Sequence, residues 1–220
     1  MSLHRAGPLC GLLFLPLYLL FAWFPERPDA STSDAQVLDI YRDGGSAGFI
    51  LLASLAMAVA GVALLVFLAD LWRRLRPAGD LATLAVGSGI LYVGTLFLAG
   101  TLWGGYAGRG GGPFEDAAGF EDSVTLARVL TDMGAGVMLI YGLFAAAVMV
   151  AAASAAGRRT GALPRGLVVA GFVIAPLLLL GVMWVPQFLV PVWVFAVSVA
   201  GLRHSPADEE AAATREPARA

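Results

Sequence analysis

The segment from Ala47 to Ala69 constrains this chain more than any other feature of its sequence. It contains 23 consecutive residues without a charged side chain. At about 1.5 Å per residue, a helix of this length extends roughly 35 Å, which is enough to cross a hydrocarbon core of about 30 Å. A surface helix of a soluble protein keeps a polar face toward water, and this segment has none. The sequence therefore predicts a membrane-spanning helix at this position.

The composition extends this prediction to most of the chain. Hydrophobic residues make up 59% of the 220 residues and charged residues only 14%, whereas charged residues form about 25% of an average soluble domain. The net charge of −2 gives no indication of a nucleic-acid partner. The single cysteine, Cys10, excludes an intrachain disulfide. We expect one transmembrane domain over residues 1–203, followed by a disordered cytoplasmic tail over residues 204–220.

The apolar segments predict an all-α, polytopic transmembrane bundle. The expected six spans cover residues 8–24, 47–69, 81–103, 133–156, 166–184 and 186–202. Residues 166–202 carry no charge and would form one helix of roughly 55 Å, too long for a single crossing. We expect the break at Pro186, because proline favours the first turn of a helix. A re-entrant hairpin remains an alternative for this region, and a cleaved signal peptide remains one for the first span.

Two signals predict helical structure outside the spans. Ser33 and Gln36 have the spacing of a capping box, so a short helix is expected through Tyr41. The pattern becomes helical again near Ser123, ahead of the fourth span. Both segments fall between spans, on the side of the membrane opposite the basic loops.

The distribution of arginine predicts the orientation. With six spans and a cytoplasmic N-terminus, ten arginines fall on inside segments and four on outside segments. Cytoplasmic loops carry an excess of basic residues. The expected topology is therefore N-in and C-in, in the inner or plasma membrane, with the lipid bilayer as the partner that the whole sequence requires.

The absence of charge at mid-span limits the possible functions. By these boundaries no Asp, Glu, Arg or His lies at the centre of a span. A buried charge in a membrane generally indicates a functional site, so its absence argues against proton relays, voltage sensors and charged pores. The sequence also shows no cluster of metal ligands and no Ser–His–Asp arrangement in one layer. We expect neither a cofactor, nor a metal, nor catalysis.

Four polar residues are candidate contacts for a ligand. Arg128 and Asp132 are four residues apart, so they can pair on one helix face at the outer edge of the fourth span. This pair is expected to be an interfacial ion pair or, alternatively, part of a polar mouth. Tyr92 and Tyr141 lie near the middle of the third and fourth spans. Their hydroxyls are expected to contact other helices or, alternatively, to line a small polar cavity.

Three short motifs carry a resemblance to a known group of proteins. They are Ser33–Asp34 with Val37 and Tyr41 ahead of the second span, residues Leu71–Arg76, and residues Thr160–Arg165, which match a TGxLPR pattern. Over roughly residues 9–202 the chain resembles a widespread group of uncharacterised, often actinobacterial, integral membrane proteins. The resemblance implies a six-helix membrane protein. It implies no reaction, substrate or cofactor.

Three hypotheses of function follow. The first is a non-catalytic membrane subunit or sensor that acts through a membrane protein partner or a second copy of the chain. Its outer loops and arginine-rich loops would make the contacts. The alternative is a carrier or binder of an apolar or lipid-like small molecule within the bundle. The third is an enzyme that works at the membrane interface around Arg128 and Asp132.

Overall fold

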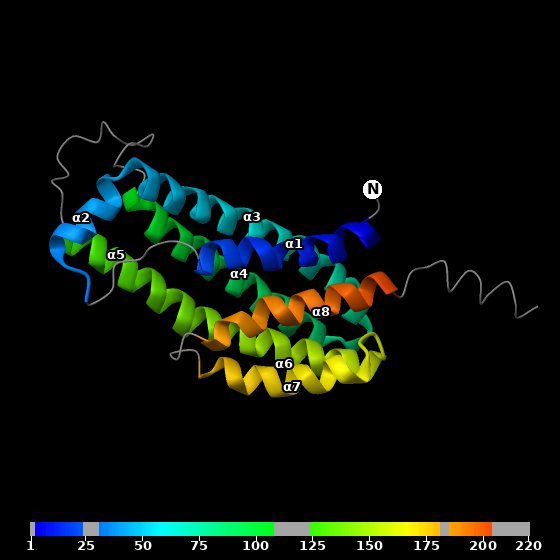
Figure 1. The fold of residues 1–220 in the computed structure, drawn as a ribbon. Helices are drawn as coiled ribbons and strands as arrows, with labels where there is room; N and C mark the ends of the chain where they lie inside the picture. Colours follow the sequence, from blue (N-terminus) through cyan, green and yellow to red (C-terminus); the bar gives the residue numbers. More distant parts are fainter. Residues whose placement is uncertain (1–2, 24–30, 108–123, 181–184, 204–220) are drawn as a thin grey trace, which may run out of the picture.

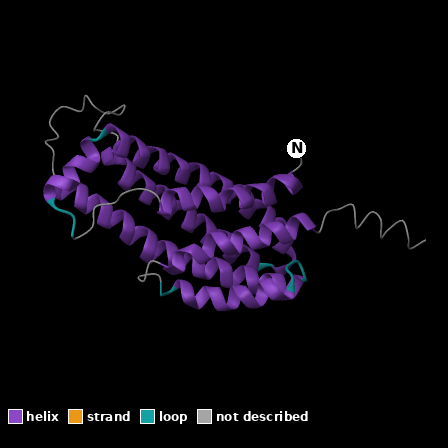
Figure 2. Ribbon diagram, in the orientation of Figure 1, coloured by secondary structure: helices purple, strands orange, loops and turns teal. Residues whose placement is uncertain are grey.

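The computed structural model describes residues 3–23, 31–107, 124–180 and 185–203. Figure 2 shows the described residues as helices with a few loops, and no strand occurs within these ranges. The all-α prediction is therefore confirmed. The predicted tail, 204–220, lies outside the described residues.

The helices follow the chain in a simple order. They are α1 (Leu3–Trp23), α2 (Asp34–Arg42), α3 (Gly44–Leu75), α4 (Asp80–Ala107), α5 (Val124–Gly136), α6 (Leu143–Thr160), α7 (Arg165–Leu178) and α8 (Leu189–Arg203). A 3₁₀ turn, η1 (Arg76–Ala78), joins α3 to α4, and another, η4 (Val185–Phe188), precedes α8. A π-helical segment, η2 (Val137–Gly142), joins α5 to α6 into one long helix.

Within the described ranges, four helices are long and apolar enough to cross a membrane: 45–78, 80–105, 124–160 and 185–203. They contain the predicted second, third, fourth and sixth spans. Large apolar side chains cover their outer faces; on α3, for example, Leu52, Leu55, Val59 and Val62 are all more than half exposed. Such surfaces suit lipid and not water. The structure therefore supports a membrane protein.

The first predicted span keeps its expected length, and the fifth ends earlier than expected. The apolar part of α1 covers residues 6–22, two residues ahead of the predicted 8–24, whereas α7 ends at Leu178 instead of near Trp184. Residues 181–184 lie outside the described ranges. The predicted break is confirmed, because Pro186 lies in the turn η4 and separates α7 from α8.

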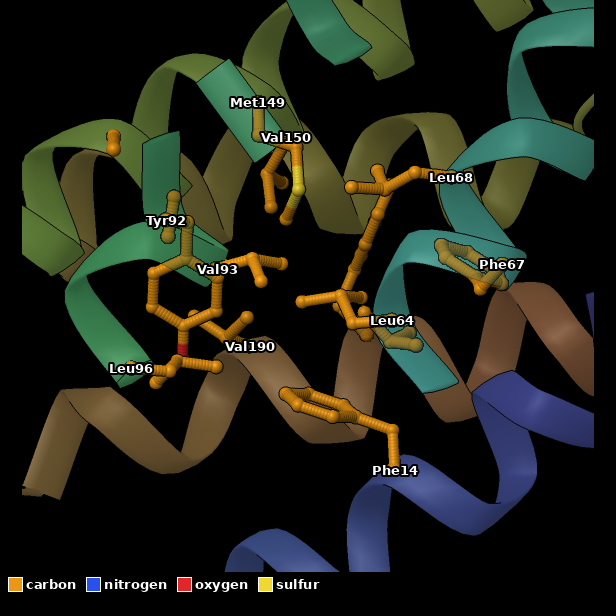
Figure 3. Packing of buried hydrophobic residues seen from close by; sticks show 14 of the residues in the cluster. Phe14, Leu64, Phe67, Leu68, Tyr92, Val93, Leu96, Met149, Val150 and Val190 are labelled. Atoms are coloured by element: carbon orange, nitrogen blue, oxygen red, sulfur yellow. The ribbon is translucent and has the colours of Figure 1, made fainter. Parts of the chain in front are cut away.

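The helices form a bundle with α1 between α3 and α8, α4 against α3 and α6, and α7 on the outer side of α6 (Figure 1). Glycine allows the closest of these contacts. A Cβ on Gly89 of α4 would lie 2.7 Å from Leu68 of α3 and 3.1 Å from the sulfur of Met149 of α6. Figure 3 shows Leu68 and Met149 together in this part of the core.

One end of the bundle carries α2 and α5, and we name it the α2–α5 end (Figure 1). The predicted capping box is present, since the Ser33 hydroxyl accepts from the Gln36 backbone N–H and the Gln36 side chain accepts from the Ser33 N–H. The apolar face of α2, including Val37 and Tyr41, packs in a separate small core with Ala127 of α5. Helix α5 begins at Val124, as the sequence predicts.

The opposite end, which we name the arginine end, holds the start of α1, the end of α3, the α6–α7 turn and the end of α8 (Figure 1). The arginines there are Arg73, Arg74, Arg76, Arg158, Arg159, Arg165 and Arg203. The ends of α1 and α8 approach α3 closely, because a Cβ on Gly7 would overlap Asp70 and one on Gly201 would overlap Arg74.

Candidate functional site

Three polar side chains, Tyr18, Tyr92 and Gln187, lie in the apolar core and form what we name the buried polar layer. They come from α1, α4 and η4 and are all 0% exposed. The Tyr18 hydroxyl donates a hydrogen bond to Oε1 of Gln187 at 3.1 Å. The Tyr92 hydroxyl lies close to Tyr18, but no hydrogen bond of normal geometry joins the two groups. Three segments that are distant in the sequence thus converge on one polar site.

Two polar groups of this layer have no hydrogen-bond partner. They are the hydroxyl of Tyr92 and the amide nitrogen Nε2 of Gln187. Figure 3 shows the Tyr92 hydroxyl between the apolar side chains of Leu96 and Val190. A buried polar group without a partner costs about 1–3 kcal/mol in a protein, and more in a lipid environment. Both groups are hydrogen-bond donors, so an acceptor atom would satisfy them.

The π-helical segment η2 contacts this site. A Cβ on Gly142, its last residue, would lie 3.6 Å from the ring of Tyr92 and 2.8 Å from the hydroxyl of Thr95. The Thr95 hydroxyl donates to the backbone carbonyl of Tyr92 at 2.7 Å. Single π-helical turns inside long helices are frequent at functional sites. The backbone irregularity therefore lies against the ring of Tyr92.

A second pair of unpaired polar atoms comes from α6 and α8. The Ser154 hydroxyl and the Trp193 indole nitrogen are buried and have no hydrogen-bond partner. Both atoms face Gly171 of α7, where a Cβ would overlap the Ser154 hydroxyl and lie 3.1 Å from the Trp193 nitrogen. Neither residue was predictable from the sequence, because isolated Ser and Trp residues in apolar segments carry no distinguishing pattern.

Asp70 is a charged residue whose position the sequence analysis assigned wrongly. The predicted span ended at Ala69, which placed Asp70 in a loop, but α3 continues to Leu75 and Asp70 is only 2% exposed. Its carboxylate pairs with Arg73 at 2.6 Å and also with Arg74. Because the two arginines lie three and four residues further along the same helix, they neutralise the carboxylate locally.

The predicted ion pair between Arg128 and Asp132 is not formed. Arg128 donates to the carboxylate of Asp34 at 3.0 Å and to the backbone carbonyl of Thr32, while Asp132 is exposed. These contacts tie the start of α2 to α5. Asp34 is 79% exposed, so the pair has the small energy typical of surface salt bridges.

The two tyrosines selected from the sequence lie in different environments. Tyr92 is fully buried in the polar layer, whereas Tyr141 on η2 is 68% exposed on the outside of the bundle. They therefore do not line one cavity. Their similar depth in the predicted spans did not show which helix face each would occupy.

At the α2–α5 end, Asp43 caps α3. Its carboxylate accepts a hydrogen bond from the backbone N–H of Ser46 at 2.8 Å. This bond, strengthened by a further contact with the Ser46 side chain, holds the pKa of Asp43 below its ordinary value. Asp43 thus stays ionised at the positive end of the α3 dipole.

Neither a metal site nor a similarity to known proteins assigns a function to these residues. Within the described ranges, no three His, Cys, Asp or Glu side chains group closely enough to hold a metal ion. The chain matches no protein-family model, no curated protein and no solved structure. Function is therefore inferred from the side chains themselves.

Proposed function

We propose that this chain is a non-catalytic integral membrane protein that binds an apolar or lipid-like small molecule at the buried polar layer. The observation that carries the proposal is the pair of unpaired donors, the Tyr92 hydroxyl and the Gln187 amide, in a fully buried apolar setting. A ligand that supplies acceptor oxygens would remove the cost of leaving both groups unpaired.

The chemistry of the layer indicates the class of ligand. Tyr18 already uses its proton in the bond to Gln187, so Tyr92 and Gln187 provide the free donors. Carbonyl, ester or ether oxygens accept such bonds without bringing a charge into the core. The surrounding apolar side chains, such as Phe14 and Leu64 in Figure 3, suit an apolar body.

The proposed topology has six spans with both termini in the cytoplasm. Two observations support it. The start of α1 and the end of α8 lie at the same end of the bundle (Figure 1), and that end carries the arginines. An excess of arginine marks the cytoplasmic side. The short helices α1 and α7 would complete the six crossings by packing alongside α3 and α6.

Reporter fusions test this topology. Green fluorescent protein fused after Ala220 should fluoresce, and alkaline phosphatase fused there should be inactive, because the first folds in the cytoplasm and the second outside it. Alkaline phosphatase inserted after Gly110, between α4 and α5, should be active. An active phosphatase at Ala220 would contradict the topology.

A second candidate function is contact with a protein partner. The α2–α5 end supports it, because the small apolar core around Val37, Tyr41 and Ala127 packs α2 onto α5 as a folded platform beyond the main bundle core. Exposed carboxylates, including Asp39 and Asp132, lie on this platform. A partner would be a membrane protein or a second copy of the chain.

Native mass spectrometry of protein extracted gently from its own membrane tests the proposed function. We expect a discrete small-molecule adduct on the wild type, distinct in mass from phospholipid. Tyr92→Phe should reduce its occupancy by about tenfold, because one hydrogen bond to the ligand is lost. Tyr141→Phe removes the same hydroxyl from an exposed site and serves as the matched control, with no expected change.

Three outcomes would count against this proposal. A wild-type protein without an adduct would remove its basis. An adduct that survives Tyr92→Phe unchanged would place the ligand elsewhere. A protein that copurifies at fixed stoichiometry, without an adduct, would favour the partner hypothesis instead.

A further inference from the structure

A groove of about 730 Å³ opens between α6 and α7 at the arginine end. Arg158, in the last turn of α6, and Arg165, the first residue of α7, form its charged part. Val169 and Phe172 of α7 form part of its apolar wall. Its volume lies within the range of about 300–1,000 Å³ that is typical of ligand sites.

The turn between the two helices holds these arginines in place. Gly161 ends α6 with a φ of 71°, a left-handed conformation that other residues rarely adopt. Leu163 is buried against Gly157, where a Cβ would come within 2.6 Å of the leucine side chain. Pro164 then directly precedes α7 as its N-cap residue. The turn between α6 and α7 therefore has little conformational freedom. It keeps Arg158 and Arg165 on the lining of the same groove.

The positive charge of the groove is not neutralised by the described part of the chain. Arg158 and Arg165 are exposed, and the ion pairs formed by described residues involve Asp70 or Asp34 instead. The N-terminus of α7 has no side-chain cap and no acidic residue in its first turn. Its backbone N–H groups and helix dipole therefore add to the attraction for an anion.

The apolar wall continues from this charged part along α7. Val169 and Phe172 lie about one and two turns after Arg165 on the same helix face, and they are 63% and 43% exposed. Helix α7 runs from the arginine end along the bundle (Figure 1). An anion with a long apolar chain matches both parts of the groove, whereas free phosphate matches only the charged part.

We propose that this groove binds the anionic headgroup and the adjoining acyl chain of a phospholipid. Basic pockets between membrane helices on the cytoplasmic side are a recurrent form of recognition for such headgroups. The proposal is independent of the buried polar layer, since none of its residues belongs to that layer. Each proposal can therefore fail without the other.

The test titrates purified full-length protein in neutral detergent with phosphatidylglycerol and counts bound lipid by native mass spectrometry. We expect phosphatidylglycerol to bind in preference to phosphatidylcholine. Replacing both groove arginines, Arg158→Gln with Arg165→Gln, should lower the affinity by about 30-fold, because each basic residue contributes a factor of about five. The control variant, Arg76→Gln with Arg203→Gln, removes the same charge from the same end outside the groove, and it should retain the wild-type affinity within about threefold.

Further variants separate the two parts of the ligand. Arg158→Lys with Arg165→Lys keeps the charge and should recover most of the affinity, which also shows that the turn still folds. Val169→Ser with Phe172→Ser should weaken binding of the long-chain lipid. Equal losses in the groove and control variants would overturn the proposal, since they would indicate diffuse surface charge. Displacement of the lipid by millimolar inorganic phosphate, or no effect of the serine variants, would overturn the assignment to a phospholipid.

Discussion

Tyr92→Phe should stabilise the ligand-free protein, and Tyr18→Phe should destabilise it. The Tyr92 hydroxyl is fully buried without a hydrogen-bond partner, so its removal should raise the free energy of unfolding by about 1–3 kcal/mol. The Tyr18 hydroxyl donates to Gln187, so its removal leaves a buried acceptor unpaired and should lower that free energy by a similar amount. One chemical change at two neighbouring sites thus has opposite expected signs.

Equilibrium unfolding in mixed detergent micelles, after exhaustive delipidation, measures both effects. Tyr141→Phe is the control, because its exposed hydroxyl should change the free energy by no more than about 0.5 kcal/mol. In protein purified with its ligand, the gain from Tyr92→Phe should disappear, since the hydroxyl is then paired. A loss of stability in the delipidated Tyr92→Phe variant would show that the hydroxyl is paired without a ligand.

Asp70→Asn should be among the most destabilising single substitutions in this chain. The carboxylate of Asp70 is buried beside Arg73 and Arg74, and the amide would leave both cations without their counter-ion. Breaking a fully buried pair costs about 3–5 kcal/mol. The two arginines keep 34% and 24% of their side-chain surface exposed, so water screens part of this cost, and we expect about 2–3 kcal/mol.

The same unfolding measurement tests this expectation. Asp39→Asn removes an equal charge from the exposed surface of α2 and should have an effect below about 0.5 kcal/mol. Gly7→Ala should also destabilise, because its new Cβ would overlap the Asp70 side chain. Wild-type stability of Asp70→Asn would mean that the Asp70 carboxylate does not stabilise the fold by neutralising Arg73 and Arg74.

Features with a local physical cause were predictable from the sequence. The capping box at Ser33 and Gln36 depends on a spacing within one helical turn, and it is present as predicted. The break near Pro186 follows from the helix length that a membrane allows. Four of the predicted spans lie inside long apolar helices, because continuous hydrophobicity requires no knowledge of the neighbouring helices.

The candidate site was predictable only in part. Tyr92 was selected because of its depth in an apolar segment, and it lies in the buried polar layer. Its neighbour Gln187 was not selected, since its hydrogen-bond partner Tyr18 is 169 residues away in the sequence. Arg128 was selected correctly as a paired residue, but its partner is Asp34 and not Asp132, because α2 folds back onto α5.

The sequence by itself determined that this chain is helical and suited to a membrane, because both properties depend on hydrophobicity and on contacts within a few residues. Only the tertiary structure decided which polar groups are buried together and which face lipid. The burial of Tyr92 and the exposure of Tyr141 depend on how α4 and η2 rotate against their neighbours. That rotation is determined by close glycine contacts and side-chain packing between distant segments, which no local pattern contains.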